Sequence, residues 1–155
     1  MNSDDGHNSL EASMRVQDIL KSKGNAVCTI IPEATIADAV GVLHQFGIGA
    51  VVVSHDGVGI QGILSERDIV RAFHDQGVSD LLVSDIMTKD VVTCSPRDRV
   101  DYMMSLMTEK RFRHVPVVDS EKLAGIISIG DVVATRVAEL EREAEALEQF
   151  IQYGR

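Results

Sequence analysis

The chain is poor in cysteine and in basic residues, and it has no long apolar run. Two cysteines among 155 residues, Cys28 and Cys94, cannot build the disulfide framework of a small secreted protein. Fifteen lysines and arginines stand against 24 acidic residues, and the net charge of −9 disfavours nucleic acid and anionic membranes as partners. No apolar run approaches the roughly 18 residues that span a bilayer. We therefore expect a cytoplasmic protein with no nucleic-acid or membrane partner.

Signatures of secretion, catalysis and metal binding are also missing. Residues 1–14 lack the basic and apolar regions of a secretory signal, so we expect a flexible leader there. The five histidines have no metal-ligand spacing, and there is no P-loop and no evident pair of nucleophile and base. The run of residues 57–62 fits G-x-G-x-x-G, but a strand follows it, so we predict a hairpin turn with glycines at positive φ. We therefore predict that the protein is not an enzyme and that it has no catalytic residue, no catalytic cofactor and no metal site.

The chain does contain an internal repeat. Residues 16–20 (VQDIL) resemble residues 83–87 (VSDIM), and Pro32 matches Pro96. A Gly-x-x-Ser-x-x-Asp element also occurs twice, as Gly62, Ser65, Asp68 and as Gly125, Ser128, Asp131. We divide the chain into the leader, two units at 15–80 and 81–137, and a C-terminal amphipathic helix at 138–155.

Each unit shows the same order of expected elements. A helix follows Thr35, with Asp38 completing a capping box, and Asp98 takes the cap position in the second unit. Apolar stripes then recur with helical spacing at Ile36, Ala39, Val40, Leu43 and at Val100, Met103, Met104, Met107, where methionine is read as a core filler. Strands are expected at 48–54, 59–64, 112–118 and 123–127. A second helix begins at each serine, and the first of these ends near Gly77.

These elements predict an α+β fold of two β-α-β-β-α units. The strands are almost continuously apolar, which indicates a sheet buried on both faces. One unit alone is too small to bury such a sheet, so the two copies are expected to pack on each other.

The Ser-x-x-Asp turns allow two interpretations. Serine at the N-cap with an acid three residues on is typical of a structural capping box. The same helix N-terminus is also suited to an anion, with the serine hydroxyl on a phosphate and the aspartate on the two hydroxyls of a ribose. The spacing alone does not decide between a cap and a nucleotide site.

The order of these motifs, given twice, resembles a tandem pair of CBS domains. The resemblance rests on the Val-x-Asp-Ile openings, on residues 113–118 (RHVPVV) and on the Gly-x-x-Ser-x-x-Asp turns, and it covers residues 15–137. It implies a pseudo-two-fold pair, a Bateman-type module, whose clefts take AMP, ADP, ATP, NAD(H) or S-adenosylmethionine. It also implies a homodimer and the following nucleotide-binding residues: Ser128, Asp131, Ser65, Asp68, Thr29, Thr93, Ala50, Val115 and Pro116. Because an acidic chain that binds an anion must supply local positive charge, we add as candidate phosphate contacts Arg111, Arg113, His114 and Arg67.

The two copies differ in their basic residues. Before its strand the second copy has Arg111, Arg113 and His114, where the first has Gly47, Ile48 and Gly49. We therefore predict two unequal clefts, with Ser128 and Asp131 as the stronger site. The function predicted is a regulatory, non-catalytic nucleotide sensor that acts through module packing or an unidentified protein partner. The alternative is a scaffold protein with vestigial clefts.

The C-terminal helix carries a seam with coiled-coil spacing. Apolar residues recur at intervals of three and four: Val133, Val137, Leu140, Ala144, Leu147 and Ile151. Glutamates including Glu139 are expected on the outside. The seam either associates with another chain or folds back on its own module, and the sequence leaves both open.

Overall fold

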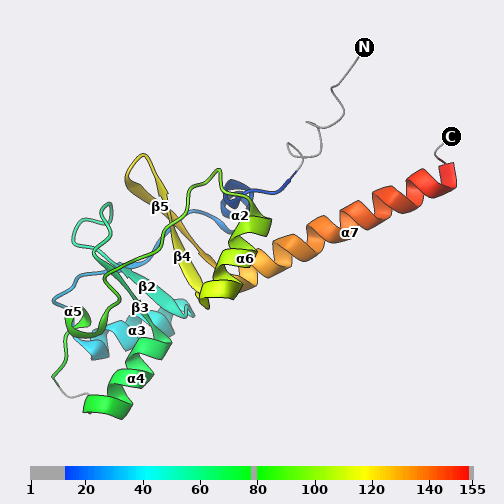
Figure 1. Ribbon diagram of the computed structural model, residues 1–155. Coiled ribbons are helices and arrows are strands. Elements are labelled where there is room, and N and C mark those ends of the chain that lie inside the picture. Colours follow the sequence, from blue (N-terminus) through cyan, green and yellow to red (C-terminus); the bar gives the residue numbers. More distant parts are fainter. Residues whose placement is uncertain (1–12, 78–79, 154–155) are drawn as a thin grey trace. The chain divides into compact units, whose positions relative to one another are not determined.

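The structure is a computed structural model that describes residues 13–77 and 80–153 (Figure 1). Its elements, in chain order, are α2 (Val16–Lys23), β1 (Thr29–Ile30), α3 (Ile36–Phe46), β2 (Ala50–Val53), β3 (Gly62–Ser65), α4 (Glu66–Gln76), α5 (Val83–Ile86), α6 (Val100–Lys110), β4 (His114–Asp119), β5 (Lys122–Ser128) and α7 (Ile129–Tyr153). Within the described residues, no helix combines the length and apolar character needed to cross a membrane. The expected leader falls almost wholly outside the described residues.

The chain forms two compact units that cut across the sequence repeat. The first, here called the sheet unit, comprises residues 25–94 and 115–126. The second, here called the long-helix unit, comprises residues 1–24, 95–114 and 127–155, as far as the structure describes them.

Each unit contains the opening segment of the other repeat. In the sheet unit, the N–H groups of Val83 and Ser84 donate to the carbonyls of Ala34 and Pro32, at 2.8 and 2.9 Å. In the long-helix unit, the N–H groups of Val16 and Gln17 donate to the carbonyls of Asp98 and Pro96, both at 2.9 Å. The opening segment of each repeat therefore makes the same two hydrogen bonds, in each case with residues of the other repeat.

The repeated Val-x-Asp opening has a direct structural reason. Val16 and Val83 are fully buried. The aspartates accept the backbone N–H that precedes each helix, so Asp18 bonds to Arg15 and Asp85 bonds to Leu82, both at 2.8 Å. A carboxylate in the first turn satisfies an orphan donor of the helix.

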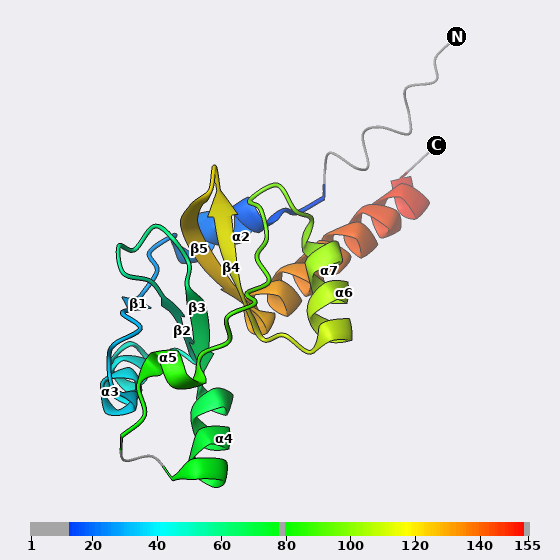
Figure 2. The same ribbon diagram turned by 60° about the vertical axis from the view of Figure 1, so that its left-hand side comes forward.

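The sheet unit is built on strands β1, β2 and β3, in that order (Figure 2). Strand β1 pairs with β2 in parallel, and β2 pairs with β3 in antiparallel register, Ala50 opposite Ser65. Val51 and Val53 join a core with residues of α3 and α4, and the alternate residues Ala50 and Val52 are buried as well. The prediction of a sheet buried on both faces is confirmed for β2.

The first strand expected in the second repeat is reduced to a single bridge. Cys94 lies opposite Val117 in parallel register, whereas the first repeat pairs both Thr29 and Ile30. Pro116 stands where the first repeat has Val52, and proline has no N–H to extend the ladder. Both repeats therefore keep the predicted β-α-β-β-α order, and the first strand of the second repeat is shortened to this bridge.

Helix α6 begins differently from the prediction. Its N-cap is Arg99, without a side-chain cap, and Asp98 instead accepts the N–H of Ser95 at 2.8 Å in the preceding turn. Helix α3 is capped as predicted, by Thr35 and Asp38. Of the two stripes, Val40 is exposed and Met104 is half-buried, whereas Met103 and Met107 are buried as core fillers.

The β2–β3 connection is the predicted turn, although only Gly57 within residues 57–62 has a positive φ, of 75°. Gly62 has another role, because a Cβ atom there would lie 2.6 Å from Met87 Sδ and 2.9 Å from the Thr88 carbonyl oxygen. The turn between β4 and β5 is strained, since Ser120 and Glu121 both have positive φ.

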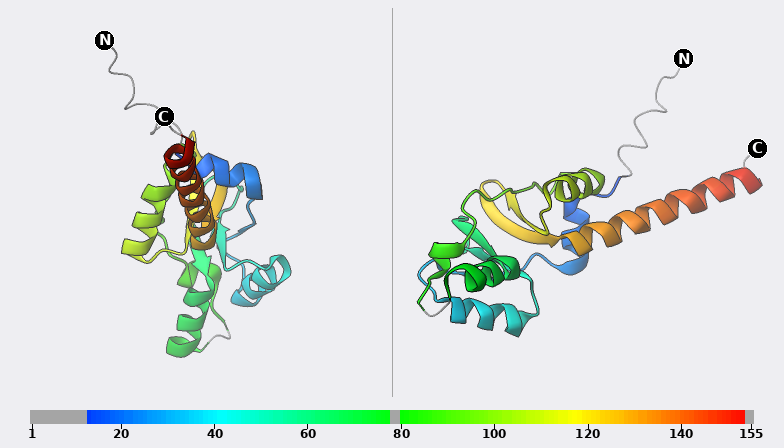
Figure 3. Two further views of the ribbon diagram at one scale, coloured as in Figure 1. Left: turned by 90° about the vertical axis from the view of Figure 1, so that its right-hand side faces the viewer. Right: turned by 60° about the horizontal axis from the view of Figure 1, so that its bottom comes forward.

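Helix α7 runs without interruption from Ile129 to Tyr153 (Figure 3). Its first half packs on α6 and α2 within the long-helix unit. Glu139 was expected on the outside but is buried, where it accepts the N–H of Met14 at 3.1 Å and pairs with Arg136 at 2.7 Å. An arginine partner and a backbone donor compensate for burying this carboxylate.

Candidate functional site

Both Ser-x-x-Asp turns form reciprocal capping boxes. Ser128 donates its N–H to Asp131 Oδ2 at 2.8 Å, and the Asp131 N–H donates to Ser128 Oγ at 3.1 Å. Ser65 and Asp68 make the same pair of bonds at 2.9 and 3.3 Å. The capping interpretation is confirmed for both turns, and each serine hydroxyl and aspartate is held at a helix N-terminus.

Asp131 has a cationic neighbour that the sequence analysis missed. Lys23 Nζ lies 2.7 Å from Asp131 Oδ2, within the long-helix unit. Burial raises the pKa of Asp131, but the hydrogen bonds from Lys23 and Ser128 outweigh it and hold the pKa below its ordinary value. The carboxylate is therefore ionised at neutral pH and acts only as an acceptor.

The repeat could have indicated that the two turns differ here. At the offset of 67 that relates the two openings, Lys23 aligns with Asp90. The second turn, at Ser128 and Asp131, thus has the basic residue Lys23 as its neighbour. The first turn, at Ser65 and Asp68, has the acidic residue Asp90 in the equivalent sequence position.

Each turn is fixed to the residue that precedes its neighbouring strand. The N–H of Ile129 donates to the carbonyl of Arg113 at 2.8 Å, and the N–H of Glu66 donates to that of Gly49 at 3.0 Å. The backbone of Arg113 therefore lies at the start of α7, next to Ser128. The backbone of this segment is therefore held next to the helix end that favours anions.

Arg111 has an unusual backbone conformation. It ends α6 at φ 58° and ψ 35°, in the left-handed region, and its counterpart Gly47 ends α3 at φ 61° and ψ 38°. Glycine is the usual residue at such a position, and an arginine there costs conformational energy. A strained non-glycine residue of this kind motivates the hypothesis that its side chain has a function.

The arginines of this segment are available for a ligand. Within residues 13–77 and 80–153, neither Arg111 nor Arg113 makes an ion pair, and both are exposed. In a chain of net charge −9, two arginines without an ion pair, one of them bonded through its backbone to a helix N-terminus, are candidates for binding an anion. In the described part of the chain, no group of His, Cys, Asp or Glu side chains is arranged to hold a metal ion.

The structure places the remaining predicted residues as follows. Ala50 pairs with Ser65 in the sheet unit, and Thr29 pairs with Val52. Val115 and Pro116 are buried in the sheet unit, His114 is half-buried in the long-helix unit, and Thr93 and Arg67 are exposed. Hydrogen bonds thus bring together Ser128, Asp131, Lys23 and Arg113 in one unit. They bring together Ser65 and Asp68 in the other.

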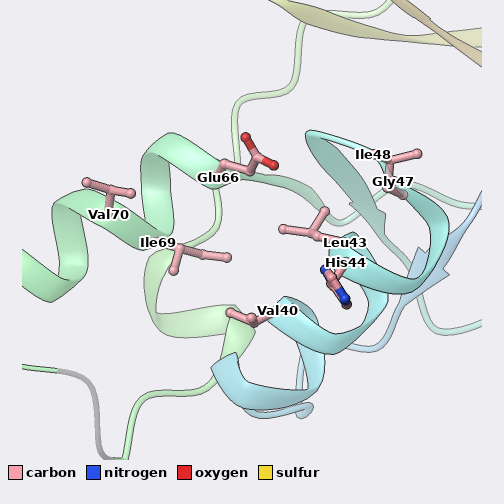
Figure 4. A pocket seen from close by; sticks show the side chains of 8 residues that line it. All are labelled: Val40, Leu43, His44, Gly47, Ile48, Glu66, Ile69 and Val70. Atoms are coloured by element: carbon pink, nitrogen blue, oxygen red, sulfur yellow. The ribbon is translucent and has the colours of Figure 1, made fainter.

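The sheet unit also has an apolar groove between α3 and α4 (Figure 4). It measures about 490 Å³ and is lined by Val40, Leu43, His44, Gly47, Ile48, Glu66, Ile69 and Val70. The Ser65 turn leads directly into α4, whose first residue Glu66 borders the groove.

Comparison with known proteins matches this chain to one family in both repeats. The model of the CBS domain matches residues 16–75 and residues 83–137. The CBS domain-containing protein CBSX3 of Arabidopsis thaliana, described as mitochondrial, is 38% identical over 154 residues, covering 92% of this chain and 74% of that protein.

Solved structures give the same result. A CBS-domain-containing protein from Agrobacterium tumefaciens is 47% identical, with a TM-score of 0.76 over 79% of this chain and 99% of that one.

Two further structures are less than 25% identical to this chain, and the comparison with them shows only that the fold is shared. The CBS domain pair of protein MJ0100, in complex with 5′-methylthioadenosine and S-adenosylmethionine, is 23% identical, with a TM-score of 0.73 over 82% of this chain and 98% of that one. CBSX2 in complex with AMP is 24% identical, with a TM-score of 0.68 over 80% of this chain and 96% of that one. The chain belongs to the CBS domain family, as a tandem pair of CBS domains followed by a C-terminal helix.

Proposed function

We propose that this CBS pair is a regulatory, non-catalytic sensor of an adenine nucleotide, with AMP, ATP or NAD(H) as the expected ligand. The observation that carries the proposal is the Ser128–Asp131 turn at the start of α7, with Arg113 bonded to it through the backbone and Arg111 held in a strained conformation. The complexes of related proteins with AMP and with S-adenosylmethionine support an adenosine-containing ligand.

In the proposed binding mode, each residue has a separate role. The ionised Asp131 accepts hydrogen bonds from the two ribose hydroxyls, and the Ser128 hydroxyl donates to a phosphate oxygen. Arg111 and Arg113 supply the positive charge for the phosphates. Lys23 now occupies Asp131 Oδ2, so ligand binding exchanges this ion pair for ribose contacts and leaves Lys23 near the phosphates.

Ser65, Asp68 and Arg67 form a second and weaker site in this proposal. The first repeat has Gly47 where the second has Arg111, and its sequence counterpart of Lys23 is Asp90. Less positive charge means weaker attraction of a phosphate. Contacts of the base with Thr29, Ala50, Thr93, Val115 and Pro116 remain predictions from the family. His114 is proposed to lie with Arg111 and Arg113 near the phosphates.

The regulatory step follows from differential affinity. A ligand shifts the packing of the module or its partner contacts only by binding one arrangement more tightly than the other. We further propose that the protein acts as a homodimer in the cytoplasm.

Thermal unfolding in the presence of each nucleotide tests the proposal. A ligand at about 100 times its Kd adds roughly 2.7 kcal/mol to the free energy of unfolding. For a chain of this size the melting temperature rises by roughly 5–10 °C. AMP, ADP, ATP, NAD(H) and S-adenosylmethionine are compared with a matched buffer. If none of them shifts the melting temperature, the scaffold interpretation is favoured instead.

Substitution of the aspartates locates the site. Asp131→Asn is expected to remove most of the shift, and Asp68→Asn to remove less. Asp38→Asn is the matched control, because Asp38 occupies the same capping position in α3 but has no proposed ligand role. A ligand-induced shift that is reduced equally by Asp38→Asn would argue against a ribose contact at Asp131.

Titration calorimetry tests whether the two sites are unequal. Arg113→Ala is expected to weaken the tighter site, whereas Arg71→Ala, which removes an exposed arginine of α4, leaves both sites unchanged. Two identical sites that are insensitive to Arg113→Ala would contradict the predicted inequality.

A further inference from the structure

The second half of α7 is an exposed amphipathic helix in the described structure. Every residue from 140 to 153 is exposed, although the apolar residues of the seam continue there. Leu147 is 63% exposed and Ile151 is 80% exposed, with Phe150 and Tyr153 beside them. We call residues 140–153 the distal segment. It lies beyond the second match to the family model, which ends at residue 137.

The distal segment gains little stability from its own residues. An isolated helix of this length is marginal in water. Its glutamates include a like-charge pair four residues apart, Glu141 and Glu145, and its last turn has no basic residue to balance the helix dipole. A continuous helix with an exposed apolar stripe and unfavourable charges is therefore suited to stabilisation by a partner.

The charges beside the seam define the partner. In heptad terms the seam consists of Leu140, Ala144, Leu147 and Ile151, and the flanking positions that face a partner helix carry Glu141, Glu143 and Glu148. Within the described residues, Glu141 and Glu148 make no ion pair, and Glu143 is 3.9 Å from Arg136 of its own helix. Arg142 lies at the outermost position, away from the seam.

A second copy of the same helix fits this surface poorly. In a parallel pair, Glu143 faces Glu148 of the other chain, and in an antiparallel pair, Glu141 faces Glu148. Both arrangements place negative charges next to each other, which disfavours pairing of the helix with a second copy of itself. A helix with lysine or arginine in the flanking positions places opposite charges there instead.

We propose that the distal segment is the docking site for a basic amphipathic helix of another protein, with an aliphatic seam flanked by lysine or arginine. The aliphatic seam buries Leu140, Leu147 and Ile151. The basic flanks neutralise Glu141, Glu143 and Glu148. The contact stabilises the helix of the distal segment and, resting on the proposed regulatory function, links the CBS pair to the protein that it regulates.

A synthetic helix serves as the probe. The peptide has four heptads, with isoleucine and leucine in the seam and lysine in the flanking positions. A second peptide has glutamate in the flanking positions, and a third keeps the lysines but has serine in the seam. Fluorescence anisotropy with the full chain is expected to show saturable binding of the first peptide, at least about tenfold tighter than of either other peptide. Equal binding of the first and third peptides would indicate nonspecific attraction and overturn the proposal.

Matched variants keep the test specific to the distal segment. Glu148→Lys is expected to weaken binding of the basic peptide several-fold, whereas Glu145→Lys makes the same charge change on the outer face and has little effect. Leu147→Asn is expected to abolish binding, with circular dichroism used to follow helix content. If light scattering shows that Leu147→Asn dissociates a dimer of the free chain, the occupant is a second copy and the proposal is wrong.

Discussion

At the scale of single residues, the sequence predicts local bonds better than bonds between distant segments. The pairs Ser65–Asp68 and Ser128–Asp131 were predictable because a capping box depends only on residues three apart. Lys23 was not, because it reaches Asp131 across 108 positions in the chain. Asp98 was wrongly placed at a cap because it bonds to Ser95, three residues before it.

Gly62 is the residue for which we predict the largest loss of stability. A Cβ at this position would overlap Met87 Sδ at 2.6 Å and the Thr88 carbonyl oxygen at 2.9 Å. Thr88 is held by its antiparallel bridge to Ile63, so its backbone cannot easily move. Gly62→Ala is expected to lower the free energy of unfolding by about 1–3 kcal/mol, as in other overpacked cores. Urea denaturation measures the change.

Gly59→Ala is the control for this substitution. The closest atom to a Cβ at Gly59 is Asp56 Oδ1 at 3.9 Å, an ordinary contact, and the residue is exposed in the same turn. We expect its stability to stay within about 0.5 kcal/mol of the parent. Equal effects of the two substitutions would show that the approach of Met87 and Thr88 to Gly62 does not limit stability.

At the scale of elements, periodicity located the helices and strands but not their pairing. The stripe from Ile36 to Leu43 predicted α3, and the serines predicted the starts of α4 and α7. The short helices α2 and α5 were recognised only as repeated sequence, since eight and four residues are too few for a clear period. The shortened pairing at Cys94 depends on Pro116 in another strand, so no local pattern shows it.

The turn between β4 and β5 is the element in which we predict that a substitution will increase the stability of the protein. Ser120 has φ 49° and Glu121 has φ 65°, which a two-residue turn requires but which side chains disfavour. Replacing the pair by Asn-Gly, through Ser120→Asn and Glu121→Gly, is expected to raise the free energy of unfolding by about 0.5–1 kcal/mol. Glu121→Ala is the control, because it removes the same carboxylate and retains the Cβ. A gain with Glu121→Ala that equals the double variant would assign the effect to charge and not to the backbone.

At the scale of the whole molecule, the sequence revealed two repeats but not the exchange of their openings. Matching residues 16–20 to residues 83–87 shows that both repeats begin alike. It does not show that Val16 bonds to the second repeat and Val83 to the first. Because the two openings have similar sequences, each could form the same local hydrogen bonds with either repeat. Which repeat an opening joins depends on how the whole chain folds. The compact units therefore differ from the units read along the sequence.

Self-association of the whole chain is the last prediction, and its surface is the outer side of α3 and α4. Val70 is 68% exposed and Phe73 is 57% exposed, and on α3 Val40 and Phe46 are exposed as well. Val40 and Val70 line the groove between the helices. Exposed apolar area of this kind on a folded protein indicates an interface. Because the distal segment of α7 disfavours pairing with itself, we expect the dimer to form through α3 and α4 and to persist when residues 140–155 are deleted.

The double variant Val70→Ser with Phe73→Ser is expected to convert the dimer to a monomer in sedimentation equilibrium, because the polar side chains remove the apolar area that association buries. The double variant Arg71→Ser with Asp75→Ser is the control, since it changes two positions on the opposite side of α4 and leaves the net charge unaltered. It is expected to remain a dimer. Circular dichroism and thermal unfolding establish that both variants are folded. A folded Val70→Ser, Phe73→Ser chain that remains dimeric would place the interface elsewhere, and loss of the dimer on deletion of residues 140–155 would assign it to α7.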